Sequence, residues 1–153
     1  ETAPLHRHHP SSTATDGGTN GNQGEQRHAG CDRSPEAGVT TRVERPWGWY
    51  EELAEGPGYK VKRLLVKENA RLSLQRHQHR SEHWVVAAGT GSVYCDGTWM
   101  DASVGNSFDI PVMAVHRAFG GPGDLLIIEV QKGAILLETD IERLEDDFGR
   151  VIR

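Results

Sequence analysis

The chain has 153 residues, of which 36% are hydrophobic and 25% are charged. A chain of this length and composition can form one domain with one hydrophobic core. A formal net charge of -5 and the lack of a basic stripe argue against nucleic acid as a partner. No apolar run approaches the roughly 20 residues of a membrane span, and we find no signal peptide. The two cysteines, Cys31 and Cys95, are too few for a disulfide framework and indicate free thiols in a reducing cytoplasm.

Residues 1–41 are rich in Gly, Ser, Thr, His, Gln and Pro and contain almost no large apolar side chain. Such a segment cannot bury enough surface to offset the entropy of ordering, so we predict a disordered tail. Its histidine cluster, residues 6–9, is interpreted as solvated, because no scaffold would hold a metal there. The folded domain is expected to comprise residues 42–153.

Short segments separated by turn residues predict that this domain is all-β. An aromatic edge strand at Pro46 to Tyr50 ends before Gly56-Pro57-Gly58, and Asp96-Gly97 has the composition of a two-residue type I′ hairpin turn. The other predicted strands are 59–66, 70–79, 83–88, 107–110, 116–119 and 125–131. Short strands at this spacing are typical of a sandwich or barrel.

One helix is predicted, at the C-terminal end of the domain. Thr139 and Glu142 have the spacing of a capping box, and Gly149 suits the position after a helix C-terminus. The apolar residues that would share one helix face are Ile141, Leu144 and Phe148. We expect this short helix to close one end or edge of the barrel.

The chain contains a concentrated set of potential metal ligands, namely Gln75, His77, His79, Glu82 and His116. The first three are two residues apart, so their side chains leave the same face of a strand. Glu82 adds a carboxylate, and His116 follows a turn on a distant segment. Imidazole nitrogens with a carboxylate oxygen suit one divalent metal ion, and Zn²⁺, Mn²⁺, Fe²⁺, Co²⁺ and Ni²⁺ all accept such a set. His83 would face the other side of its strand, so we interpret it as a core residue or as a partner of a ligand.

These clusters resemble the two cupin motifs. Glu82 and Gly89 have the spacing of the first motif, and Gly105, Pro111 and His116 have the offsets of the second. Over roughly residues 43–153 the chain also resembles the C-terminal domain of type II phosphomannose isomerases. The matching motifs are Arg45-Pro46-Trp47-Gly48, Tyr59-Lys60-Val61-Lys62-Arg63, Gln75 to Trp84, Ile128-Glu129-Val130-Gln131 and Glu145-Asp146-Asp147-Phe148-Gly149-Arg150. The resemblance implies the cupin double-stranded β-helix, which is a jelly-roll barrel.

The second motif departs from the cupin pattern at two positions, because Met113 stands where glycine is usual and Gly120 where asparagine is usual. Methionine adopts a positive φ only with strain, so we expect the turn that presents His116 to be reshaped. We find no segment that resembles the nucleotidyltransferase domain of the bifunctional members of the family.

The resemblance leaves two ligand sets open. With the usual four-residue spacer before Glu82, the preceding ligands are Gln75 and His77, as in type I phosphomannose isomerases. With a spacer of two residues they are His77 and His79. His77, Glu82 and His116 belong to both sets, and a cupin that binds no metal is the alternative to either.

The resemblance implies a metal-dependent isomerase that interconverts mannose 6-phosphate and fructose 6-phosphate in carbohydrate metabolism or polysaccharide biosynthesis. Moving a proton between C1 and C2 needs a base near pH 7 and an electrophile, which the metal supplies. The candidates for the base are Glu129, Lys62 and, where it is not a ligand, His79. The candidates for contact with the phosphate are Arg63, Arg80, Arg117 and Arg150.

Two other classes of function stay open, namely a non-catalytic sugar-binding or regulatory cupin and an iron-dependent cupin oxygenase with the same barrel and ligands. Exposed strand edges and the aromatic segment at residues 47–50 favour covering by a second subunit. We therefore expect a homodimer.

Overall fold

The computed structural model describes residues 40–151. The predicted tail lies outside the described residues apart from Thr40 and Thr41, and so do Cys31 and the histidine cluster. Within residues 40–151 the regular elements are eleven β-strands, which confirms the all-β prediction. No helix long and apolar enough to cross a membrane is found in this part of the chain.

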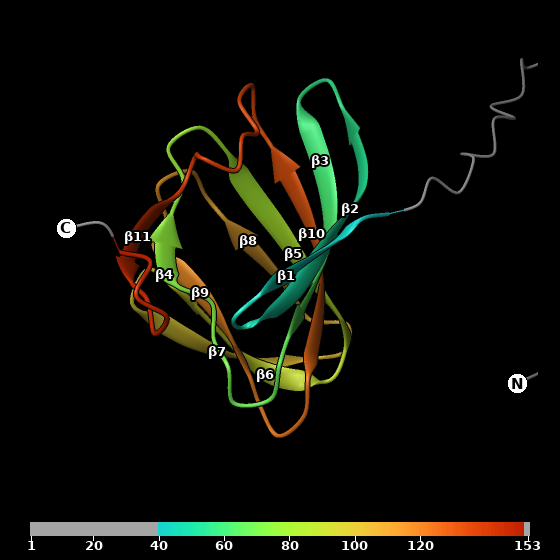
Figure 1. The fold of residues 1–153 in the computed structure, drawn as a ribbon, viewed down its shortest axis with the longest axis vertical. Coiled ribbons are helices and arrows are strands. Elements are labelled where there is room, and N and C mark those ends of the chain that lie inside the picture. Colours follow the sequence, from blue (N-terminus) through green and yellow to red (C-terminus); the bar gives the residue numbers. More distant parts are fainter. Residues whose placement is uncertain (1–39, 152–153) are drawn as a thin grey trace, which may run out of the picture. The chain divides into compact units, whose positions relative to one another are not determined.

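The strands form two antiparallel sheets (Figure 1). The first sheet contains, in spatial order, β1 (Arg42–Arg45), β2 (Gly48–Gly56), β3 (Tyr59–Val66), β10 (Leu125–Lys132), β5 (Ser81–Ala88) and β8 (Ser107–Ile110). The second contains β11 (Glu142–Glu145), β4 (Leu74–Arg76), β9 (His116–Gly120), β6 (Thr90–Cys95) and β7 (Thr98–Ser103). Two facing antiparallel sheets are the predicted jelly-roll arrangement.

The interior is apolar at one end and polar at the other, because three neighbouring strands change character along their buried faces. At the apolar end the register places together Leu64, Val66, Val86, Leu125 and Ile127. Farther along the same strands the buried residues are Lys62, Glu82, Glu129 and Gln131. Each buried aliphatic side chain stabilises the fold by roughly 1.5–3 kcal/mol. The apolar end therefore stabilises the packing of the two sheets, and the buried polar side chains are concentrated at the other end of the barrel.

The predicted hairpin turn at Asp96-Gly97 is present. Cys95 pairs with Thr98, and the two residues between them have φ angles of 42° and 92°. Positive φ at both central positions is the geometry of a type I′ turn, which suits the twist of the flanking strands.

The predicted C-terminal helix is wrong. Residues 142–145 form β11, which pairs with β4, and Arg76 donates from Nε to Glu142 Oε2 at 2.7 Å across the pair. Leu144 and Phe148 are about 40% exposed rather than packed on one helix face. Pairing with the free edge of β4 satisfies more backbone groups than a short exposed helix would, so tertiary context overrides the local signal.

The expectation of a reshaped turn before His116 is also wrong. Met113 adopts a φ of 68°, so the turn keeps the left-handed conformation that glycine would take. Its amide donates to the carbonyl of His77 at 2.8 Å, which ties the turn to the segment after β4. The strain at Met113 is thus retained, and His116 is presented towards His77.

A stability measurement at Met113 tests this strain. Because φ is positive, Met113→Gly should unfold with a free energy about 1 kcal/mol higher than Met113→Ala. At the neighbouring exposed Val112, whose φ is not positive, the glycine variant should instead be less stable than the alanine variant. Urea unfolding of the four variants checks this, and the same order at both positions would contradict strain at Met113.

Candidate metal centre

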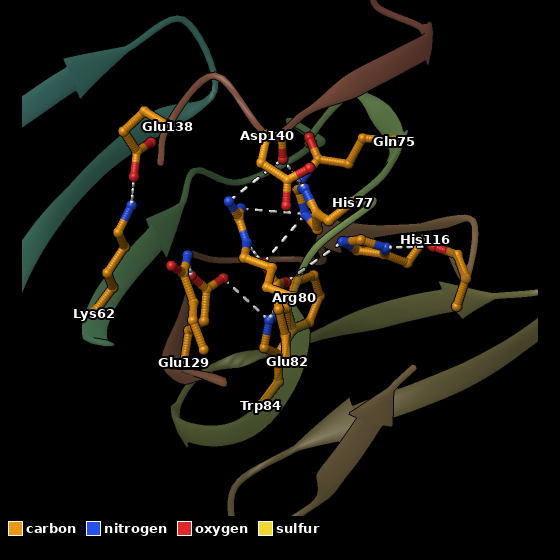
Figure 2. Close-up of polar contacts among 12 residues, drawn as sticks. Lys62, Gln75, His77, Arg80, Glu82, Trp84, His116, Glu129, Glu138 and Asp140 are labelled. Atoms are coloured by element: carbon orange, nitrogen blue, oxygen red, sulfur yellow. Dashed lines mark hydrogen bonds and ion pairs between the residues drawn. The ribbon is translucent and has the colours of Figure 1, made fainter. Parts of the chain in front are cut away.

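Three buried side chains from separate parts of the chain meet at the polar end of the barrel (Figure 2). His77 follows β4, Glu82 lies on β5 and His116 begins β9. One potential ligand atom from each lies within 4.8 Å of the others. Glu82 Oε1 is 3.2 Å from His77 Nε2, and Glu82 Oε2 is 3.5 Å from His116 Nε2. We call these three residues the His-Glu-His group.

Both imidazoles are oriented by backbone carbonyls. His77 Nδ1 lies 2.6 Å from the carbonyl oxygen of Asp140, and His116 Nδ1 lies 2.9 Å from that of Ala114. A carbonyl oxygen only accepts, so each Nδ1 donates to it, and each Nε2 is left facing Glu82, where a lone pair becomes available to an ion when Nε2 is deprotonated. His116 Nε2 is buried and has no hydrogen-bond partner among residues 40–151. An oriented imidazole with a free Nε2 is what a metal-ligating histidine requires, so the donor set fits a divalent ion.

The electrostatics of the group also favour a cation. Burial alone would raise the pKa of Glu82, but the imidazoles of His116 and His77 beside its carboxylate hold it well below its usual range. Burial lowers the pKa of His116, and the contact with Glu82 outweighs that effect and raises it. Glu82 is therefore an ionised carboxylate that needs positive charge around it.

Arg80 supplies part of that positive charge. Its Nε donates to Glu82 Oε1 at 2.9 Å, and its Nη2 lies 3.3 Å from His77 Nε2. Its Nη1 donates to the carbonyl oxygen of Leu137 at 3.1 Å. The guanidinium thus joins the His-Glu-His group to the segment at residues 133–141, which we call the strap.

A second buried carboxylate, Glu129, lies beside the group. Trp84 Nε1 lies 3.1 Å from both Glu82 Oε2 and Glu129 Oε2 and so bridges the two carboxylates. Gln131 Nε2 donates to Glu129 Oε1 at 2.6 Å. Burial, followed by the charge of Glu82, raises the pKa of Glu129 to about 7. A carboxyl group of this kind can exchange a proton near neutral pH.

A cavity of about 120 Å³ opens beside Glu129 and Gln75. Its cationic lining residues are Arg45, Lys62, Arg80, Arg143 and Arg150. Lys62 forms an ion pair with Glu138 of the strap, and Arg150 donates to Asp146 at 2.6 Å. Arg143 Nε is buried and has no partner among the described residues. The cavity therefore suits an anionic group.

The structure brings most of the predicted site residues to this end of the barrel. His77, Glu82 and His116 form the group, and the cavity is lined by Gln75, Lys62, Glu129 and Arg150. The amide of Gln75 is held by Ser73, whose hydroxyl lies 2.7 Å from Oε1. His79 is exposed and lines a different pocket, between residues 78–79 and residues 135–142. The ligand set with His79 therefore has no support from the geometry.

Three other predicted residues face away from the cavity. Arg63 pairs with Glu51, and Arg117 lies on the outer side of the second sheet. His83 faces away from the group, as expected, but is a partly exposed residue 2.7 Å from Asp109 rather than a core residue or a partner of a ligand.

Arg45 and Arg143 were missed as cavity residues. Arg45 belongs to the Arg45-Pro46-Trp47-Gly48 motif, but the sequence alone did not indicate that its side chain lines the cavity. Arg143 reaches the cavity because it lies opposite Gln75 in the β11–β4 pair. This pairing could not be expected from the sequence, because we predicted a helix over these residues.

Comparison with known proteins identifies relatives. A family model described as mannose-6-phosphate isomerase C-terminal matches residues 32–146. Alginate biosynthesis protein AlgA of Pseudomonas aeruginosa is 50% identical over 110 residues, which are 71% of this chain and 23% of that protein. Mannose-1-phosphate guanylyltransferase of Escherichia coli is 44% identical over 115 residues, which are 74% of this chain and 24% of that protein. The chain thus spans about a quarter of the length of these relatives.

Solved structures with a similar fold confirm the cupin barrel. The capsular polysaccharide assembling protein CapF of Staphylococcus aureus superposes with a TM-score of 0.60 at 19% identity, over 70% of this chain and 34% of that one. An RmlC-like cupin of Shewanella frigidimarina has a TM-score of 0.58 at 22% identity, over 63% of this chain and 86% of that one.

Metal content of a Glu82 variant tests the proposed centre. Glu82→Gln keeps the size of the side chain but removes the only carboxylate of the group, so affinity for Zn²⁺ or Mn²⁺ should fall more than about 100-fold. His83→Gln, on the opposite face of the same strand, is the matched control and should bind metal like the wild type. Elemental analysis after dialysis, with circular dichroism to verify folding, makes the measurement. Equal metal content in both variants would contradict the assignment.

Proposed function

The chain belongs to the mannose-6-phosphate isomerase C-terminal family, and from that premise we propose that it is a metal-dependent isomerase of mannose 6-phosphate and fructose 6-phosphate. One observation carries the proposal. An oriented His-Glu-His group and a buried carboxyl group with a pKa of about 7 lie next to one cavity lined by cationic side chains. An aldose–ketose isomerase of a sugar phosphate needs an electrophile, a base and a site for the phosphate.

The electrophile is the first requirement. When bound by His77, Glu82 and His116, a divalent metal supplies Lewis-acid stabilisation of the sugar oxygens at C1 and C2. Trp84 and Arg80 donate to the two oxygens of Glu82 and thereby fix the orientation of that carboxylate.

Glu129 is assigned as the base. From mannose 6-phosphate it takes the proton on C2 and returns it to C1, while the hydroxyl proton at O2 passes to O1, which gives fructose 6-phosphate. A base with a pKa near the working pH is best suited to such a transfer, because it is available in both protonation states. Lys62 is less suited, since its ammonium group is paired with Glu138 and lies 4.4 Å from the ring centre of Tyr50.

The phosphate is assigned to the arginine-rich wall of the cavity. Guanidinium groups offer paired N–H donors that match phosphate oxygens. Arg143 has a buried Nε without a partner among the described residues, and Arg45 and Arg150 line the cavity with it. An anion bound there would relieve the repulsion among these charges.

A non-catalytic sugar-binding cupin is the second candidate, and the position of Arg80 favours it. The guanidinium contacts Glu82 and His77, two of the three proposed ligands, and so supplies positive charge to the carboxylate without an ion. In that function the cavity would bind the sugar phosphate and no proton would be transferred.

Turnover of a Glu129 variant separates the two functions. In a coupled assay with mannose 6-phosphate, Glu129→Gln should lower kcat about 10²- to 10⁴-fold, because the amide cannot accept the proton. Wild-type kcat should fall as the pH decreases through about 7, since the carboxyl group becomes protonated, and the variant should lose this dependence. Glu55→Gln, at an exposed glutamate on β2, is the control and should behave like the wild type.

Two results would contradict the isomerase. A Glu129→Gln variant with wild-type turnover would exclude Glu129 as the base. A wild-type protein with stoichiometric metal and no turnover of either sugar phosphate would favour the sugar-binding cupin.

The homodimer stays a prediction. Two side chains of the aromatic segment, Trp47 and Tyr50, are buried within the chain, and the guanidinium of Arg42 lies 3.9 Å from the ring centre of Trp49. The segment therefore needs no partner to cover it, and the free sheet edges are the remaining reason to expect one. Light scattering at micromolar concentration should give twice the mass of the chain, and the mass of one chain would refute the dimer.

A further inference from the structure

A second cleft, of about 270 Å³, lies on the outer face of the five-stranded sheet. Its lining residues are Arg71, Leu74, Tyr94, Trp99, Arg117 and Glu145. All five strands of the sheet contribute a side chain in register, because Glu145 lies opposite Leu74, and Tyr94 lies opposite both Arg117 and Trp99. Gln75 pairs with His116, so their sequence neighbours Leu74 and Arg117 also lie side by side on β4 and β9. These side chains therefore form one row that crosses the whole sheet.

The cleft and the His-Glu-His group lie on opposite sides of the same strands. His116 faces the interior, so Arg117, the next residue of β9, faces outward. A ligand in the outer cleft would therefore not enter the cavity beside Glu129.

One end of the cleft is aromatic. Trp99 lies on the edge strand β7 and is 53% exposed, and its ring centre is 5.3 Å from that of Tyr94. The face of an aromatic ring carries partial negative charge, and the C–H groups on one face of a sugar ring carry partial positive charge, so the two surfaces attract each other. An exposed tryptophan supported by a second ring is thus a suitable platform for a sugar.

The other end contains an incompletely paired guanidinium. Arg117 is 3% exposed, its Nε donates to the carbonyl oxygen of Leu72 at 3.0 Å, and its Nη1 donates to Glu145 at 3.3 Å. Its Nη2 is buried and has no partner among residues 40–151. Arg71 lines the same cleft and is held in a two-point contact by Asp147, at 2.7 and 2.8 Å. An N–H group removed from water without an acceptor costs free energy, which an anionic acceptor would recover.

We propose that this outer cleft is a second binding site, which takes a sugar ring carrying one anionic group, either a carboxylate or a phosphate. The ring lies on Trp99 and the anionic group accepts from Arg117. The cleft is small and mixed in polarity, whereas a stable protein interface buries roughly 800 Å² on each partner, so a single sugar unit fits it better than a protein surface. The site is independent of the proposed isomerase chemistry.

Two tryptophan side chains make the test specific. Trp99 lies in the outer cleft, and the indole N–H of Trp84 lies between the two carboxylates of the barrel. Nuclear magnetic resonance of the ¹⁵N-labelled chain resolves the indole signals, which Trp99→Phe and Trp84→Phe assign. The probes are glucuronate, which carries a carboxylate, mannose 6-phosphate, which carries a phosphate, and neutral mannose.

Both anionic sugars should shift the Trp99 signal with saturation, and mannose at the same concentrations should not. Glucuronate should leave the Trp84 signal in place, which separates the outer cleft from the barrel cavity. The tighter of the two anionic probes identifies the preferred anionic group.

Calorimetry with glucuronate then measures the contribution of the ring. Trp99→Ala should weaken binding about tenfold, the order expected for one lost aromatic contact. Val104→Ala, at a more exposed residue outside the cleft, should bind like the wild type. Turnover of mannose 6-phosphate by Trp99→Ala should equal that of the wild type, so failure of this site and failure of the isomerase are distinguishable.

Three results would overturn the proposal. The first is a Trp99 signal that neither anionic sugar shifts. The second is a Trp99 signal that mannose shifts equally. The third is a Trp99→Ala variant that binds glucuronate like the wild type. A Trp99 signal that depends on protein concentration instead of on sugar would show that this face contacts a second copy of the chain.

Discussion

The buried carboxylate of Glu82 is the constraint on which the polar end of the barrel depends. An ionised carboxylate inside a protein is unfavourable unless it is paired and hydrogen-bonded. Here two imidazoles, a guanidinium and an indole N–H surround it. Each of these partners is in turn fixed by another element, so the loss of one would disturb the rest.

Two of those fixing elements come from distant parts of the chain. The strap orients His77 through the carbonyl oxygen of Asp140, whose carboxylate also accepts from the amides of Gln78 and His79. The strained turn at Met113 precedes His116 and is bonded to the carbonyl oxygen of His77. Local strain at Met113 is therefore retained because the surrounding contacts determine the position of both histidines.

Much of this arrangement was predictable from the sequence, for physical reasons that differ between elements. Turn residues between short segments predicted most of the strands, and Asp96-Gly97 predicted its turn because few residue pairs accept positive φ at both positions. Two strand predictions were wrong: the aromatic segment lies in β2, between β1 and β3 and not at an edge, and the strand predicted at 70–79 is only Leu74–Arg76. The spacing of His77, Glu82 and His116 followed the cupin pattern. The β11 strand, Arg143 in the cavity and the row from Glu145 to Trp99 were not predictable, since each depends on which strands pair and in which register. Local propensity even favoured a helix where β11 lies.

Anomalous diffraction from a crystal grown with Zn²⁺ would locate an ion at the His-Glu-His group. A metal centre there predicts one strong peak within about 2.0–2.2 Å of His77 Nε2, His116 Nε2 and an oxygen of Glu82. No peak at that position, with the guanidinium of Arg80 still bonded to Glu82 and His77, would contradict a metal centre and leave a cupin whose buried carboxylate is balanced by its own side chains.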